Sequence, residues 1–191
     1  MVATLAVPTL IEAARRIGVE LHKVNSGGNL YVWHTPPPEE AVVYIGKSAS
    51  DKRPNEERGW RDGLDPKAEI VSGIVALLRV NQAVPQHLYY DPDMFDASKW
   101  RNFRDKDGWT GAALDYLNKA LPPGAKLSEE QVEQLLVRIA VRYGVPIGNS
   151  QFASQWEGPI GLVPDTLAVL AVSYDSSFVI PAPHPEAEPE S

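Results

Sequence analysis

The chain has 191 residues, of which 43% are hydrophobic and 23% are charged, and these proportions exclude a fibrous or largely disordered protein. The sequence contains no cysteine, which excludes disulfide scaffolds, thiolate metal sites and cysteine nucleophiles. The formal net charge of -7 disfavours broad, non-specific binding to phosphate. Basic residues nevertheless gather in two segments, at Lys47, Lys52, Arg53, Arg58 and Arg61, and again at Lys99, Arg101, Arg104 and Lys106.

The first predicted element is a helix from Pro8 to Gly18. Thr9 and Glu12 have the spacing of a capping box, and Gly18 is a residue at which helices commonly end. One face of this helix is apolar and consists of Leu10, Ala13, Ala14 and Ile17. We expect the helix to belong to a lead-in at residues 1–27 and to pack on the elements that follow.

The start of the chain does not resemble a secretion signal. No basic region precedes its short apolar stretch, and Glu12 and Arg15 follow soon after. The later apolar run at 160–174 is interrupted by Pro164 and Asp165 and is too short to span a bilayer. We therefore expect a cytoplasmic protein with no membrane partner.

Two short strands are predicted next, in GGNLYVWH at 27–34 and AVVYIGKS at 41–48. Apolar and aromatic residues alternate in both, and the connection TPPPEE is short, a pattern that favours an antiparallel hairpin. In such a hairpin Tyr31 and Tyr44 can point to the same face of the sheet. Two phenols would then share one site.

The segments after the hairpin complete the predicted sheet. A polar stretch at 50–63 is interpreted as a short helix or a turn interrupted at Pro54. The stretch AEIVSGIVALLRV at 68–80 is rich in β-branched residues and predicts a third strand with Gly73 as a bulge, a helix being the alternative. These elements predict a three-stranded antiparallel sheet.

A loop-rich insertion is predicted at about 82–125, with a short amphipathic helix at 112–121. Its aromatic and basic side chains could stack on a nucleic acid strand, or they could fasten the insertion to the core. These side chains are Trp100, Arg101, Phe103, Arg104 and Trp109.

The strongest helix signal follows the insertion. Ser128 and Gln131 form a capping box, and Gly144 followed by Pro146 marks the end of the helix. Its apolar face consists of Val132, Leu135, Leu136, Ile139, Ala140 and Tyr143, and it must pack against the sheet.

The last part of the chain is predicted to cap the domain. Residues 151–180 form this C-terminal cap, with a short helix at 165–172. The remainder, at 181–191, is rich in proline and glutamate and is predicted to be a disordered acidic tail.

The order of these features resembles the GIY-YIG nuclease family. The second strand carries the motif literally in VVYIGKS, and the first carries it more loosely, with Gly28, Leu30 and Tyr31. The resemblance covers residues 28–150 and implies an α/β fold with a small three-stranded antiparallel sheet flanked by helices. It also implies a DNA endonuclease, a phosphodiester hydrolase that uses Mg²⁺ or Mn²⁺, of the kind found in homing, restriction, repair, and phage or mobile elements.

The resemblance implies roles for particular residues. Tyr31 would be the base that activates water, assisted by Tyr44. Because the ordinary pKa of tyrosine is near 10, it would need nearby cations such as Lys47 or Arg53, or a metal-bound water, to act as a base at neutral pH. Glu133 would be the protein ligand of the metal ion. Its place at the border of the apolar stripe lets a carboxylate be half-buried beside the sheet.

Other residues follow from the same resemblance. Arg53 would hold the scissile phosphate, with Arg58 as the second choice, because a guanidinium presents a planar fork to phosphate oxygens. Glu129 is the alternative metal ligand, one turn before Glu133. Asn149 would brace the site, and the substrate would also be contacted by Gly46, Lys47 and Arg58.

A non-enzymatic function is the alternative. The same fold could serve as a catalytically inactive DNA-binding or protein-assembly module. The net charge of -7 favours a protein partner, and a homodimer also stays open. The combination of Tyr31, Tyr44, Arg53 and Glu133 favours the endonuclease.

Overall fold

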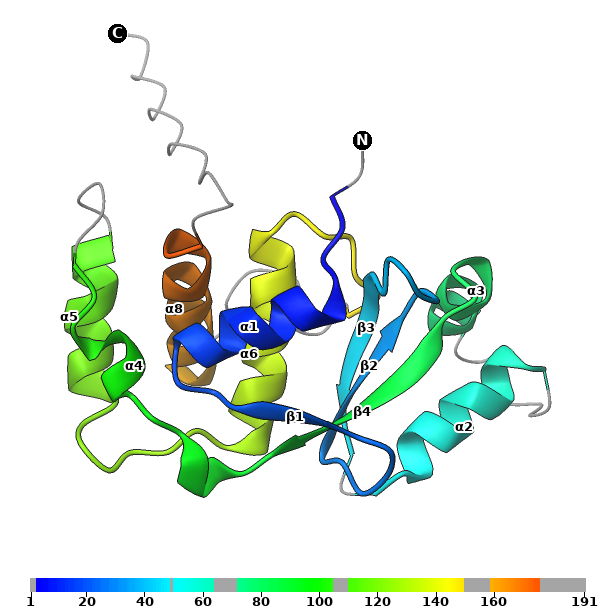
Figure 1. Ribbon diagram of the computed structural model, residues 1–191, viewed down its shortest axis with the longest axis horizontal. Helices are drawn as coiled ribbons and strands as arrows, with labels where there is room; N and C mark the ends of the chain where they lie inside the picture. Colours follow the sequence, from blue (N-terminus) through cyan, green and yellow to red (C-terminus); the bar gives the residue numbers. More distant parts are fainter. Residues whose placement is uncertain (1–2, 49, 64–71, 105–109, 150–158, 176–191) are drawn as a thin grey trace, which may run out of the picture.

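Four antiparallel strands form one sheet in the computed structural model, which describes residues 3–48, 50–63, 72–104, 110–149 and 159–175 (Figure 1). The strands are β1 (Leu21–Val24), β2 (Leu30–His34), β3 (Val42–Lys47) and β4 (Val84–Tyr90). Their order across the sheet is β1, β4, β2, β3, so the strand with Tyr31 lies between two neighbours. The predicted α/β class and the predicted hairpin of β2 and β3 are confirmed.

The predicted third strand at 68–80 is wrong. The described part of this segment is helix α3 (Ser72–Val80), and the sheet has four strands rather than three. Val75 and Leu78 are buried whereas Arg79 and Val80 are exposed, which is a helical spacing. Burial of this face outweighs the β-branched composition of the segment.

Two strands come from segments that the sequence analysis did not assign to strands. β4 lies in the region predicted as a loop-rich insertion, and β1 lies in the predicted lead-in. β4 was not predicted because it contains Pro85, and proline lacks the N–H group that a residue of a central strand donates. β1 pairs only with residues 87–90, so Pro85 lies beyond the end of β1 and opposite Trp33 of β2.

Helices cover both faces of the sheet (Figure 1). On one side lie α2 (Lys52–Arg61) and α3, which contact each other. On the other side α1 (Val7–Arg16), α6 (Glu129–Arg142) and α8 (Pro159–Ser173) pack together. The 3-10 turn η2 (Pro92–Met94), α4 (Ser98–Arg101) and α5 (Thr110–Ala120) follow β4, and α5 packs on α8 at the end of the molecule away from α2.

Alternate residues of β2 belong to these two layers. Leu30 and Val32 join the main hydrophobic core with α1, α6 and α8. Tyr31 and Trp33 join a second cluster with Leu78 of α3. Every residue of β2 is buried, which is the pattern of a strand covered on both faces. The tyrosines therefore lie on the face that α2 and α3 cover.

The helix predicted at the start of the chain is present, but its predicted cap is wrong. Helix α1 begins at Val7, and its N-cap is Ala6, which makes no side-chain capping bond. Thr9 therefore lies inside the first turn rather than at the cap. Pro8 is tolerated there because the first N–H groups of a helix have no partner within the helix.

Helix α6 matches the sequence prediction closely. The Ser128 hydroxyl accepts a hydrogen bond from the Gln131 N–H, and the Gln131 side chain accepts one from the Ser128 N–H. Helix α8 includes the predicted helix at 165–172 but begins earlier and has Pro164 inside it. None of the helices in the described ranges has the length and hydrophobicity required to cross a bilayer. The predicted tail at 181–191 and Trp109 lie outside the described residues.

The capping box gives a direct test of this helix assignment. We expect Ser128→Ala to lower the free energy of unfolding by about 1 kcal/mol, because the first turn of α6 loses its side-chain acceptor. Thr9→Ala is the matched control, and we expect a change within about 0.5 kcal/mol because Thr9 is exposed and caps nothing. Urea denaturation of both variants measures the difference, and equal destabilisation would contradict the assignment.

Candidate active site

Tyr31 and Tyr44 lie on the same face of the sheet, as the hairpin predicts. Tyr31 is paired across the strands with Gly46, and Tyr44 is paired with Trp33. The two phenol rings have their centroids 6.3 Å apart and are tilted by 38°. Tyr31 is almost completely buried, whereas Tyr44 is partly exposed, so Tyr44 forms the solvent-facing side of the pair.

Gly46 makes room for the Tyr31 ring. A Cβ atom at Gly46 would fall well inside van der Waals contact with Cζ and the hydroxyl oxygen of Tyr31. Gly46 is buried, so its immediate surroundings are this ring rather than solvent. Glycine is needed here for packing, because only glycine lets the neighbouring strand bring a tyrosine over this position, and substrate contact by Gly46 stays a prediction.

A third residue, Glu57 of α2, completes the site and was missed by the sequence analysis. Its side chain is 0% exposed, and its carboxylate accepts hydrogen bonds from two side chains of β2. The Tyr31 hydroxyl donates to Glu57 Oε1 at 2.9 Å, and Trp33 Nε1 donates to Oε2 at 2.7 Å. The signal was present in the sequence as a helical spacing, because Pro54, Glu57 and Trp60 share the buried face of α2.

Arg53 lies one helical turn before Glu57 and reaches the same carboxylate. Its Nε donates to Glu57 Oε1 at 3.1 Å, and its guanidinium lies over the Trp60 ring, 4.6 Å from the centroid. The Arg53 side chain is 42% exposed, so part of its fork faces solvent. Arg58 lies on the exposed side of α2, with Nη1 3.5 Å from Asn55 Oδ1. Of the two predicted arginines, the structure thus brings Arg53 to the tyrosines.

The surroundings of the two phenols favour their protonated forms. Burial, and then the Glu57 carboxylate, raise the pKa of Tyr31 far above its ordinary value. The same two causes raise the pKa of Tyr44 to about 12. Arg53 acts in the opposite direction on both but is outweighed. Arg53 thus lowers the pKa of Tyr31 as expected, but burial and the Glu57 carboxylate, which accepts the hydrogen bond of this hydroxyl, have the larger effect.

Glu133 of α6 comes to the outer side of this pair. Its carboxylate accepts a hydrogen bond from the Lys47 backbone N–H, and its charge acts on Tyr44. Burial raises the pKa of Glu133, while the charge of Lys47 lowers it. The alternative carboxylate, Glu129, is engaged elsewhere, because its Oε1 accepts from Asn29 Nδ2 at 3.1 Å.

Asn149 is joined to the motif strand itself. Its Oδ1 accepts from the Ile45 N–H at 2.9 Å, and its Nδ2 donates to the Ile45 carbonyl at 2.5 Å. Gly148 N–H donates to the Val43 carbonyl at 2.8 Å. The segment after α6 therefore behaves like an added edge strand, and it fixes the backbone between Tyr44 and Gly46.

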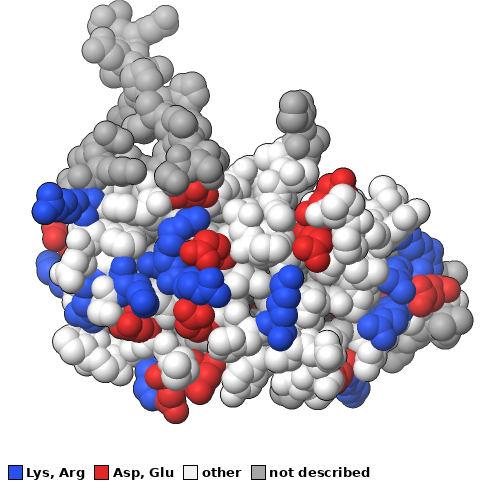
Figure 2. Space-filling model, viewed as in Figure 1, with Lys and Arg blue, Asp and Glu red and all other residues white. Residues whose placement is uncertain are grey.

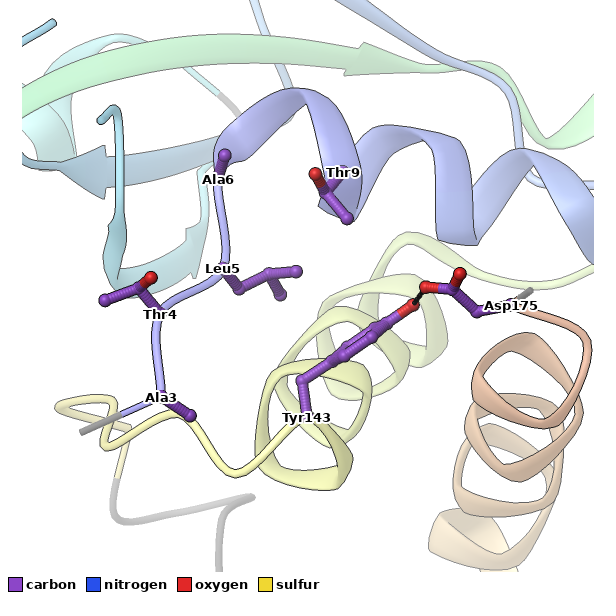
Figure 3. A pocket seen from close by; sticks show the side chains of 7 residues that line it. All are labelled: Ala3, Thr4, Leu5, Ala6, Thr9, Tyr143 and Asp175. Atoms are coloured by element: carbon purple, nitrogen blue, oxygen red, sulfur yellow. Dashed lines mark hydrogen bonds between the residues drawn. The ribbon is translucent and has the colours of Figure 1, made fainter. Parts of the chain in front are cut away.

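A separate hollow is lined by residues other than these (Figure 3). It has a volume of about 350 Å³ and lies between the start of the chain and the ends of α6 and α8. Its polar side consists of Tyr143, whose hydroxyl donates to Asp175, together with Thr4 and Thr9. None of the predicted site residues lines it.

Glu133 is the site residue that could take part in holding a cation. Among the described residues there is no group of three or more histidine, cysteine, aspartate or glutamate side chains able to hold a metal ion. Magnesium keeps several waters and commonly binds one or two carboxylates together with substrate phosphates. The half-buried carboxylate of Glu133 fits such a site.

Searches of protein-family models, curated proteins and solved structures found no match to this chain.

The space around Gly46 can be tested by substitution. We expect Gly46→Ala to lower the free energy of unfolding by about 1–3 kcal/mol, because the added methyl group forces the buried Tyr31 ring to move. Gly59→Ala in α2 is the matched control, since a Cβ there meets nothing within 4 Å. It should stabilise the protein by about 0.5–1 kcal/mol through helix propensity. Chemical denaturation measures both changes, and a neutral Gly46→Ala would show that the ring does not depend on this glycine.

Proposed function

We propose that this chain is a cytoplasmic endonuclease with a GIY-YIG-like fold that hydrolyses phosphodiester bonds of DNA with the help of Mg²⁺ or Mn²⁺. The observation that carries the proposal is the environment of the Tyr44 phenol. Its ring centroid lies 6.3 Å from that of Tyr31, and the charges of Glu57 and Arg53 from α2 and of Glu133 from α6 all influence its pKa. A base, a phosphate-binding cation and a metal-binding carboxylate are the groups that such hydrolysis needs.

Tyr31 is the proposed base. Its hydrogen is already donated to Glu57, so the hydroxyl oxygen offers its lone pairs to an attacking water. Tyr44 lies on the solvent-facing side and orients that water beside Tyr31. Rigid placement matters here, because both rings are fixed by the paired strands rather than by loops.

Arg53 is the proposed phosphate ligand. Negative charge develops on the phosphate oxygens during the displacement, and a guanidinium stabilises it most when its orientation is fixed in advance. Stacking on Trp60 and the bond to Glu57 fix the Arg53 side chain while leaving part of it open to solvent. Lysine could not make the same combination of stacking and forked hydrogen bonding.

Glu133 would hold the metal ion, with Lys47 beside it for the phosphate backbone. When bound, Mg²⁺ or Mn²⁺ would neutralise the departing oxygen and the phosphate. The carboxylate is fixed by the Lys47 N–H at the end of β3, immediately after the Tyr44 to Gly46 motif. This contact between the end of β3 and α6 supports Glu133, rather than Glu129, as the proposed metal ligand.

DNA contact would be local rather than spread over the protein. On the face seen in Figure 2, lysine and arginine side chains form separate groups with acidic side chains among them. The net charge of -7 agrees with this pattern. Binding that relies on few phosphate contacts has a shallow dependence on salt.

A catalytically inactive DNA-binding or protein-assembly module is the second candidate. The raised pKa values of both phenols favour it, because a tyrosine that keeps its proton is a poor base unless something takes that proton. The net charge also suits a protein partner, including a second copy of the chain.

Cleavage of supercoiled plasmid in Mg²⁺ and Mn²⁺ tests the proposal, and Glu133→Gln is the decisive variant. We expect it to abolish metal-dependent nicking with little loss of folding, because the amide keeps the shape of the side chain but removes its charge. DNA binding should weaken less than cleavage. Glu130→Gln on the exposed side of α6 is the control, and it should cleave like the wild type. Wild-type nicking by Glu133→Gln would contradict the metal assignment.

Tyr31→Phe tests the base. We expect cleavage to fall by about 10²–10⁴-fold, the usual loss for a general base, while DNA affinity is kept. The variant also removes one donor from buried Glu57, so the free energy of unfolding should fall by about 1–3 kcal/mol. Tyr89→Phe, at an exposed tyrosine of β4, is the control for both measurements. Cleavage by Tyr31→Phe at the wild-type rate, measured well below its melting temperature, would remove Tyr31 from the reaction.

A further inference from the structure

The surroundings of Glu57 point to a role beyond packing. Its carboxylate is fully buried and is surrounded by three donors, namely the Tyr31 hydroxyl, Trp33 Nε1 and Arg53 Nε. Burying a charged group in this way is costly, and the cost is offset only because these three donors surround the carboxylate. Two of its three partners are the proposed base and the proposed phosphate ligand.

We propose that Glu57 is a positioning residue that accepts the proton of Tyr31 while Tyr31 accepts a proton from the attacking water. This inference rests on the proposed endonuclease function. As the water oxygen bonds to phosphorus, one water O–H bond breaks and its proton bonds to the Tyr31 oxygen. The Tyr31 O–H bond breaks in turn, and that proton passes along the 2.9 Å hydrogen bond to Glu57 Oε1.

The hydrolysis needs no further reactant to balance its electrons and protons. The P–O3′ bond breaks, the departing oxygen takes the bonding pair, and it is protonated by solvent. Tyr31 ends as a neutral phenol, as it began, and Glu57 ends as a carboxylic acid. The proton returns to solvent by the reverse path through Tyr31, because the carboxyl group itself is 0% exposed.

This relay removes the difficulty that the raised pKa of Tyr31 presents. A free tyrosinate at this position is unfavourable because of burial and the adjacent carboxylate. In the relay the phenol never carries a full negative charge, because it gains one proton as it loses another. Burial also raises the pKa of Glu57, which brings the carboxylate closer to the range in which it can hold a proton during turnover.

The relay predicts a pH dependence with a definite sign. Glu57 can accept a proton only when it is ionised, so cleavage should fall as the pH drops through its raised pKa. The titratable or charged groups that face it are Tyr31 of β2, Tyr44 of β3 and Arg53 of α2. Arg53 and the donated hydrogen bonds oppose the effect of burial. Neither tyrosine titrates in the acidic range, so the groups of the site that give an acidic limb are Glu57 and the half-buried Glu133, whose pKa burial also raises.

The test compares Trp33→Phe with the double variant Trp33→Phe/Glu57→Gln. Glutamine at 57 alone would set its amide N–H group against the Trp33 N–H donor, and the single variant could fail to fold for that reason. Trp33→Phe removes this conflict, and circular dichroism and DNA binding confirm that both proteins are folded. We expect the double variant to cleave plasmid about 10²–10⁴-fold more slowly than Trp33→Phe and to have a less steep acidic limb, because Glu133 is then the carboxylate of the site that still titrates.

A second readout does not depend on cleavage. The Trp33 indole N–H donates to Glu57, so its ¹H–¹⁵N resonance reports the charge of the carboxylate. Its loss in Trp33→Phe assigns it among the five tryptophans. In the wild type we expect this resonance to shift with pH at the same midpoint as the acidic limb of cleavage. Midpoints that differ by more than about one pH unit would overturn the relay.

The outcomes separate this inference from the proposed function. If the wild type cleaves and the double variant matches Trp33→Phe in rate and pH profile, Glu57 is only structural and the endonuclease proposal stands. If the wild type cleaves no DNA in either metal, the endonuclease proposal fails and the relay fails with it. A slower double variant whose acidic limb has the same midpoint and steepness as that of Trp33→Phe would also overturn the relay, because Glu57 would then not contribute to the limb.

Discussion

The buried carboxylate of Glu57 is the constraint on which the rest of the site depends. A carboxylate without water must be surrounded by donors, and removing one partner of a buried charged pair typically costs about 3–5 kcal/mol. Tyr31 and Trp33 supply donors from β2, and Arg53 supplies one from α2. The helix is therefore held at one position over the sheet, and the Tyr31 hydroxyl has one orientation. What stabilises this layer of the fold also arranges the residues proposed for catalysis.

The motif strand β3 is held by different interactions at its two edges. On the side toward β2, Gly46 leaves the space that the Tyr31 ring occupies. On the outer edge, Asn149 bonds both backbone groups of Ile45, so its side chain replaces a neighbouring strand. The end of β3 then supplies the Lys47 N–H that holds Glu133. Residues that are far apart in the chain thus meet along the last few residues of β3.

The electrostatics of the site differ from those of the whole protein. The chain is acidic, yet Arg53 and Lys47 stand beside the tyrosines and Glu133, where a phosphate would be held. Two carboxylates influence the phenol pair. Glu57 of α2 is closed to solvent and accepts the Tyr31 hydrogen bond, whereas Glu133 of α6 is half-buried. Burial raises the pKa of both groups, but only Glu133 keeps access to solvent.

The sequence by itself determined the elements whose signals are local. The β2 and β3 hairpin, the shared face of its tyrosines and the capping box of α6 follow from a period of two and from residues three positions apart. Local signals could not identify β4, because the missing N–H group of Pro85 is tolerated only where β1 has already ended. They could not identify α3 either, because its conformation depends on burial under the sheet. The helical spacing of Pro54, Glu57 and Trp60 was present in the sequence, but it did not by itself show that Glu57 is buried. A glutamate in a charged helix is ordinarily exposed, and only tertiary packing, which brings Tyr31 and Trp33 over it, makes a buried carboxylate stable.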